Sequence, residues 1–205
     1  VYSRRQSIAF ESGKAVMNLV NHDIRIKDII TKDAILNAIK VNSAIGGSTN
    51  AVLHLLAIAY EAGVDLGIFE FGKVSMSVPH MVPMIPAGQY TLLDFYEAGG
   101  IPVMMKELES ILSLDGMTCT GHTSRENKNK NKDVIRSLSN PVHHRGGIAV
   151  LKGNIAPDGA VTKPSAIPEK ALLFKGPAKI YESEQDALRG IRAGQVHGGE
   201  VVGIR

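Results

Sequence analysis

A pair of glycines followed by helix-capping residues and a long apolar run constrains the fold of this chain more than any other stretch. Gly46 and Gly47 free the backbone for a tight or left-handed turn. They are followed by three residues that favour helix N-caps, Ser48, Thr49 and Asn50. Ala51–Tyr60 is almost wholly apolar, and Gly63 stands where a helix would stop. The stretch predicts a flexible turn that leads into a buried helix.

The start of that predicted helix is a candidate anion site. Helix starts offer unpaired backbone N–H groups and a partial positive charge, which suit a carboxylate or a phosphate. A well-capped core helix without a ligand has the same sequence pattern, and capped helices far outnumber anion sites. The residues of Gly46–Asn50 leave both interpretations open.

Length and composition predict a cytoplasmic globular protein. The 205 residues suffice for one large or two small domains, and 44% are apolar while 21% are charged. No apolar run is long enough to span a bilayer, and the first six residues lack the apolar core of a signal peptide. The single cysteine excludes an internal disulfide and fits a reducing compartment. We therefore expect no membrane partner.

The small positive charge of the chain comes from one segment. Five basic and two acidic residues lie between Arg125 and Arg136, which accounts for the whole net charge of +3. Its lysines alternate with asparagines, a pattern typical of a solvated loop rather than of a basic binding face. We therefore expect no nucleic-acid partner.

The residues up to about 132 predict a mainly helical part. Apolar spacing, caps and stop signals indicate helices at Ser7–Val20, Thr31–Asn42, Ala51–Tyr60, Leu92–Ala98 and Val103–Leu112. Val78–Gln89 contains three prolines, which excludes a regular helix or a central strand. We expect that segment to run extended along the surface or over a cleft.

Beyond Lys132 the pattern changes to short strands separated by Gly and Pro turns. The predicted strands are Ile148–Lys152, Ala160–Lys163, Ala171–Phe174, Ala178–Tyr181 and Glu200–Ile204. One helix interrupts them, with Ser183 as its cap and Gly194 at its end. The sequence thus predicts an α/β protein in which a mainly helical part, residues 1–132, precedes a β-rich part, residues 133–205.

Few side chains point to a reaction by themselves. Cys119 has no Cys or His at ligand spacing and lies in a strand-like stretch, so we expect a small buried hydrophobe. Adjacent His143 and His144 would point to opposite faces of a strand, which favours a polar turn. His54 could reach the Gly46–Asn50 turn, but a hydrogen-bonded core histidine is commoner. Asn154 is either an ordinary turn former or part of a cleft wall.

A series of long motifs carries a family resemblance along the whole chain. In order they are Gly46–Ala59, Glu97–Pro102, Met105–Leu108, Gly153–Val161, Phe174–Ala178 and Ser183–Ala187. These motifs resemble the family of dihydroxy-acid dehydratases, which also includes phosphogluconate and other sugar-acid dehydratases. The resemblance implies that residues 1–132 are the end of an α/β N-terminal domain. Residues 133–205 would begin a β-barrel-like swivelling domain, with the active site between the two.

The resemblance also implies a hydro-lyase that converts a 2,3-dihydroxy carboxylic acid into a 2-keto acid. In that family an iron–sulfur cluster, 2Fe–2S or 4Fe–4S, and Mg²⁺ assist the departure of hydroxide and hold the substrate. The implied partners are the dihydroxy-acid substrate and further copies of the protein, as a homodimer or a dimer of dimers.

The chain departs from the family pattern at the catalytic residues. The family's cluster cysteines and most magnesium ligands precede the residue matching Val1, and its serine base follows the residue matching Arg205. Cys119 stands where the family has an apolar residue. We therefore expect no catalytic or metal-binding residue here and no dehydratase activity from this chain alone. The remaining substrate-cleft candidates are Gly46, Gly47, Ser48, Thr49, Asn50 and Asn154.

Three functions stay open on the sequence. A dihydroxy-acid dehydratase of branched-chain amino-acid synthesis leads, because Ala51–His54 resembles that branch. A sugar-acid dehydratase is the alternative, because Val78–Pro83 and Ile85–Tyr90 differ from the usual valine-pathway pattern. A catalytically inert fragment or binding module is the third.

Overall fold

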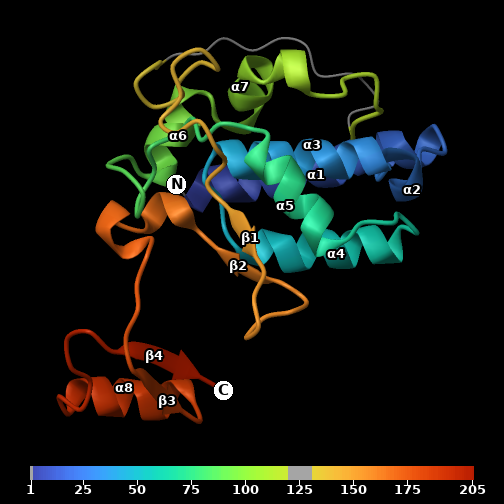
Figure 1. Ribbon diagram of the computed structural model, residues 1–205. Coiled ribbons are helices and arrows are strands. Elements are labelled where there is room, and N and C mark those ends of the chain that lie inside the picture. The colour runs from blue at the N-terminus through green and yellow to red at the C-terminus, as the bar shows by residue number, and fades with distance from the viewer. Residues whose placement is uncertain (1, 120–130) are drawn as a thin grey trace. The chain divides into compact units, whose positions relative to one another are not determined.

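The computed structural model describes residues 2–119 and 131–205, and Figure 1 shows their arrangement. The chain divides into two compact units, Val1–Ala166 and Ile167–Arg205. The helices are α1 (Tyr2–Asn21), α2 (Ile26–Ile29), α3 (Lys32–Ala44), α4 (Asn50–Glu61), α5 (Ile68–Met76), α6 (Leu92–Ala98), α7 (Gly100–Glu107) and α8 (Glu184–Arg192). The strands are β1 (Ala149–Leu151), β2 (Ala160–Thr162), β3 (Ala178–Tyr181) and β4 (Val201–Ile204). Three short 3-10 helices complete the described elements, η1 (Glu109–Ile111), η2 (Pro164–Ala166) and η3 (Glu169–Ala171).

Helix α3 lies between the two core clusters of the first unit. Its Ile35 and Ile39 are buried with residues of α4 and α5, whereas its Val41 and Ala44 are buried with residues of α6 and α7. The predicted cap at Thr31 is confirmed, because its side chain accepts a hydrogen bond from the backbone N–H of Ala34 at 3.2 Å. The helix thus fixes the Gly46 turn, which follows it directly, against both clusters.

The proline-rich segment after α5 is irregular, as predicted; its first residues are buried, whereas Ile85, Pro86, Gly88 and Gln89 are exposed. Val78, Met81 and Val82 are buried. Burial is possible because neighbouring segments pair its backbone: the N–H of Met81 donates to the carbonyl of Ala44 at 2.7 Å, and the N–H of Arg136 donates to the carbonyl of Met81 at 3.1 Å. The prolines excluded regular structure correctly, but they carried no information about these long-range partners.

Helix α4 is only half buried, which contradicts the expected core helix. Val52 and Ala59 are buried, whereas Leu53 and Tyr60 are 68% and 82% exposed. Helix α5 lies in a stretch for which the sequence analysis predicted no helix. Its Phe71 is fully buried and belongs to the same core cluster as Val52. The apolar run of α4 therefore indicated a helix without indicating how much of it is covered.

Strands β1 and β2 form an antiparallel hairpin in which Val150 pairs with Val161. Figure 1 shows this hairpin beside α5, and the two elements are in contact. A side chain at Gly72 of α5 would come within 2.8 Å of the Val150 side chain, so the absence of a Cβ there permits the contact. The predicted strands over 148–152 and 160–163 are confirmed at their centres.

The second unit is a β3–α8–β4 arrangement in which the two strands pair in parallel. Ser183 caps α8 as predicted, accepting from the N–H of Asp186 at 3.1 Å, and Gly194 follows its end. The expected strand at Ala171–Phe174 is wrong, because η3 and a bend occupy those residues. Helix and strand are mixed as predicted for the α/β class. The described residues form two separate two-stranded sheets rather than a closed barrel.

Candidate functional site

The two glycines of the candidate turn close helix α3. Gly46 has a φ of +58° and its N–H donates to the carbonyl of Ser43 at 3.2 Å. The N–H of Gly47 donates to the carbonyl of Asn42 at 2.8 Å. This pair of bonds is the Schellman motif, in which a residue with positive φ lets the chain satisfy the last helical carbonyls. The turn is therefore a closed C-terminal cap rather than a flexible loop.

The first amides of α4 have partners within the chain, contrary to the expectation of unpaired donors. The N–H of Asn50 donates to the Ser48 hydroxyl oxygen at 3.2 Å, and the N–H of Ala51 donates to the Ser48 carbonyl at 3.2 Å. The N–H of Val52 donates to the carbonyl of Thr49 at 3.1 Å. Thr49 occupies the N-cap position but its side chain makes no capping bond. What the turn offers to a ligand is the exposed side chains of Ser48 and Asn50.

A buried histidine lies directly against this turn. His80 is 1% exposed, and a Cβ added at Gly46 would lie 2.5 Å from its Nε2 atom. Its ring stacks on the ring of His143 with centroids 5.4 Å apart and planes 16° apart. The pKa of His80 is lowered to about 4, mainly by burial and then by the proximity of His143 and Lys163, while the Val82 backbone opposes this shift. The imidazole is therefore neutral near pH 7.

The residues at the base of the β1–β2 hairpin also pack against the turn. The N–H of Gly147 donates to the carbonyl of Ser43 at 2.9 Å, and a Cβ added at Gly147 would lie 2.6 Å from the Cα of Gly46. Two backbones thus approach where neither residue has a side chain. Nearby, Ser165 donates to the carbonyl of Gly147 at 3.3 Å, and burial lowers the pKa of the half-buried Lys163. Gly46 is enclosed between His80 and Gly147.

The structure brings five of the six cleft candidates together. Gly46, Gly47, Ser48, Thr49 and Asn50 form the turn itself. Asn154 is exposed in the loop at the tip of the hairpin, whereas the turn meets the base of that hairpin. The hairpin therefore separates Asn154 from the turn by its own length.

The sequence interpretation missed His80 and Gly147. His80 lies in the proline-rich segment, which was expected to run along the surface or over a cleft, and no local pattern indicated the burial of this histidine. The doublet Gly146-Gly147, which directly precedes a predicted strand, was the available signal for a close backbone approach.

The exposure of four other side chains decides whether the environment predicted for each of them is right. His54 is exposed on α4, which contradicts the expected core histidine. Cys119 is exposed in a turn, so neither its expected burial nor its expected strand is right. His143 and His144 are exposed, as predicted for a polar turn. Half of the basic segment 125–136, residues 125–130, lies outside the described residues. Within residues 2–119 and 131–205, no group of three His, Cys, Asp or Glu side chains is placed to hold a metal ion.

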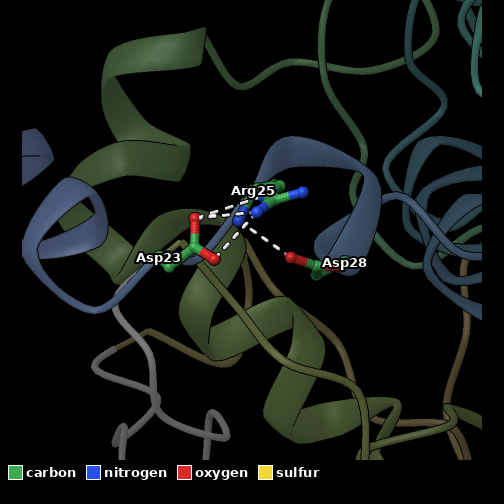
Figure 2. A network of polar contacts seen from close by, with 3 residues as sticks. All are labelled: Asp23, Arg25 and Asp28. Atoms are coloured by element: carbon green, nitrogen blue, oxygen red, sulfur yellow. Dashed lines mark hydrogen bonds and ion pairs between the residues drawn. The ribbon is translucent and has the colours of Figure 1, made fainter.

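Two surface cavities lie away from the turn. One, of about 700 Å³, is lined by residues of α2 and by the C-terminal half of α4, from Ala57 to Gly63. Its one arginine, Arg25, is already engaged: Figure 2 shows its guanidinium donating to Asp23, at 2.8 Å to Oδ2, while its N–H donates to Asp28 at 2.9 Å. The other, of about 590 Å³, is lined by Pro83, Gly88, Gln89, Tyr90, Asp133 and Arg136. Neither is lined by a residue of the turn.

None of the helices in the described part of the chain is long and apolar enough to cross a membrane.

Two family models match the chain in succession. The model described as dihydroxy-acid/6-phosphogluconate dehydratase N-terminal matches residues 1–127, and the corresponding C-terminal model matches residues 133–205. Curated relatives named dihydroxy-acid dehydratase are similar along the same residues. The relative from Halothermothrix orenii is 44% identical over 210 residues, which cover 100% of this chain and 38% of the relative. The relative from Acetivibrio thermocellus is 46% identical over 211 residues with the same coverage. The chain thus spans 38% of the length of the curated relatives it matches.

Proposed function

The chain belongs to the dihydroxy-acid/6-phosphogluconate dehydratase family, and we propose that the full-length protein is a dihydroxy-acid dehydratase. The reaction is the removal of water from a 2,3-dihydroxy carboxylic acid, which gives a 2-keto acid. The observation that carries the proposal is the identity of 44% with relatives of that name along the whole chain. The role in branched-chain amino-acid synthesis belongs to the same proposal.

Within this function the Gly46–Asn50 turn forms part of the substrate cleft. Its glycines are closed into a cap, so the turn is rigid, and rigid elements hold substrates in productive geometry. The exposed hydroxyl of Ser48 and amide of Asn50 are suited to hydrogen bonds with a substrate carboxylate or hydroxyl. The nearby start of α4 adds a favourable dipole for the carboxylate. Asn154, at the hairpin tip, is the candidate from the C-terminal domain.

The cofactors of the proposed reaction are an iron–sulfur cluster, 2Fe–2S or 4Fe–4S, and Mg²⁺. They would supply Lewis-acid assistance to the departure of hydroxide. The described residues of this chain do not fit either group, because Cys119 stands alone and no carboxylate or histidine cluster accompanies it. The ligands and the catalytic base are therefore proposed to lie in the rest of the full-length protein, which leaves this chain inactive alone.

The remaining parts of the proposal concern the whole protein. Residues 133–205 would begin a swivelling β-barrel-like domain that the rest of the protein completes. The working form would be a homodimer or a dimer of dimers in the cytoplasm, where the exposed thiol of Cys119 stays reduced.

A substrate panel on the purified full-length protein tests the reaction. We expect conversion of 2,3-dihydroxyisovalerate with a kcat/KM at least about tenfold above that for gluconate or 6-phosphogluconate. A preference for the sugar acids would establish the alternative branch, and loss of both activities in a metal-loaded protein would establish an inert fold.

Alanine substitution tests the role of the turn. Exchanging Ser48 and Asn50 for alanine in the full-length protein should raise KM or lower kcat, because both side chains are exposed on the turn that is proposed to line the cleft. Unchanged kinetics with lower thermal stability would show that the turn serves only to join α3 and α4.

A further inference from the structure

His80 is fixed by contacts of both its backbone and its ring. Its backbone N–H donates to the carbonyl of His143 at 2.9 Å, and its carbonyl accepts from Val142 at 2.8 Å. Its ring stacks on the ring of His143, so backbone and side chain are fixed by the same neighbour. The next residue, Met81, is bonded to Ala44 at the end of α3. The backbone bonds therefore fix the position of the Cα of His80, while stacking and burial restrict the ring itself.

The burial of His80 is not explained by a contribution to stability. Its Nδ1 atom is buried and has no hydrogen-bond partner. An unpaired buried polar atom costs stability, whereas an aliphatic side chain of similar volume would fill the same space without that cost. An aliphatic side chain would not reproduce the flat, rigid edge of the imidazole ring. That edge faces Gly46, since a Cβ there would lie 2.5 Å from Nε2 and 3.0 Å from Cδ2.

We propose that His80 is a positioning residue for the Gly46–Asn50 turn, and that its ring edge sets where Ser48 and Asn50 stand for the substrate. This inference rests on the proposed function, which assigns the turn to the substrate cleft. His80 acts through the backbone of Gly46 and touches no reacting atom. Gly147 also approaches Gly46 closely, so the position of the turn is restricted by two segments distant in the sequence.

Variants of the full-length protein test the proposal. His80→Ala removes the ring, and His80→Gln keeps a neutral polar group at a similar reach. His54→Ala is the matched control, because it removes the same side chain from an exposed position on α4. Each variant is measured for kcat and KM with the 2,3-dihydroxy acid, and for hydrogen exchange of the backbone amides of residues 46–50, at a temperature well below its unfolding.

The expected result is a higher KM without a matching change in kcat. His80→Ala should raise KM about tenfold or more, leave kcat within about twofold, and speed exchange at residues 46–50 about tenfold. His80→Gln should recover most of the KM, and His54→Ala should match the parent protein in both measurements. Lower thermal stability of His80→Ala with unchanged KM and unchanged exchange would overturn the proposal.

The two measurements separate this inference from the proposed function. If the parent protein converts no dihydroxy acid, the proposed function fails, and the exchange measurement still decides whether His80 holds the turn. If exchange is faster but KM is unchanged, His80 holds a turn that the substrate does not use, and the inference fails while the dehydratase activity stands.

Discussion

The turns at Gly46 and Gly63 share one backbone motif but differ in what packs against the glycine. Gly46 follows α3 with a φ of +58°, and Gly63 follows α4 with a φ of +69°. Each makes the same pair of backbone bonds to its helix; at Gly63, the N–H of Val64 donates to the carbonyl of Ala59 at 2.8 Å. Yet Gly46 lies against His80, whereas a Cβ at Gly63 would meet nothing within 4 Å.

The comparison separates a local rule from a tertiary one. Positive φ explains a glycine at both positions, because other residues adopt that conformation at a cost of about 1–2 kcal/mol. Only at Gly46 does a packed neighbour, His80, also leave no room for a Cβ. The turn that is proposed to line the substrate cleft is thus the one that is contacted by a residue distant in the sequence, His80.

The largest expected effect is that of Gly46→Ala. The substitution adds backbone strain and places a Cβ 2.5 Å from Nε2 of the confined His80 ring, so we expect a loss of about 2–5 kcal/mol in the free energy of unfolding. Urea unfolding of the full-length protein measures it. In a His80→Ala background the loss should fall to about 1–2 kcal/mol, and equal losses in both backgrounds would show that the ring contact is not what distinguishes Gly46.

The second effect is acid sensitivity from His80. Its pKa is about 4 in the folded protein against an ordinary value of 6.5, so the unfolded chain binds more protons between these values. Stability is therefore complete above pH 6.5 and is lost as the pH falls toward 4, by about 2–3 kcal/mol at pH 4.5. Urea midpoints at pH 7 and pH 4.5 measure the loss. The His80→Gln protein should lose less over the same range, and an equal loss would assign the sensitivity to other groups.

A smaller effect is expected for Gly63→Ala. Only the positive φ is strained there, because the site is open to solvent, so the loss should be about 1–2 kcal/mol. The same urea measurement applies. A loss as large as that of Gly46→Ala would mean that the rest of the full-length protein packs against Gly63, which would break the comparison.

The smallest effect is expected for Thr49→Ala, at the helix start beside the Gly46 turn. The Thr49 side chain makes no capping bond, so its loss should cost at most about 0.5 kcal/mol. Thr91→Ala is the control, because Thr91 does cap α6 by accepting from the N–H of Asp94 at 3.2 Å and should cost about 1 kcal/mol. Equal losses in thermal unfolding would contradict the difference between the two caps.

Elements with strong local signals were predictable, and their surroundings were not. Thr31 and Ser183 were predicted as caps and are caps, and Gly63 and Gly194 end their helices as expected. The long motifs, in their order along the chain, were sufficient to identify the family. The interpretation failed where a short stretch fits two environments: α4 is half exposed, the segment around Met81 is buried, and Cys119 is exposed.

The candidate site shows the same division. The Gly46–Asn50 turn was predicted from its residue types, and the structure places those residues as one turn between α3 and α4. His80, Gly147 and the partners of the first α4 amides could not be predicted, since they follow from contacts between segments far apart in the sequence. Local sequence patterns reflect the conformational preferences of a few neighbouring residues. For this reason the caps, the turns and the helix of the apolar run could be predicted.

By itself, then, the sequence determined the family, the mixed helical and strand character, and the need for glycine at the end of α3. Tertiary structure alone decided that the first part of the proline-rich segment is buried and that its histidine lies against Gly46. The physical reason is that burial and close approach depend on which distant backbone groups are available to pair. The carbonyls of Ser43 and Ala44 are left without helical partners in the last turn of α3, and the packing of α3 between its two clusters decides which distant N–H groups reach them.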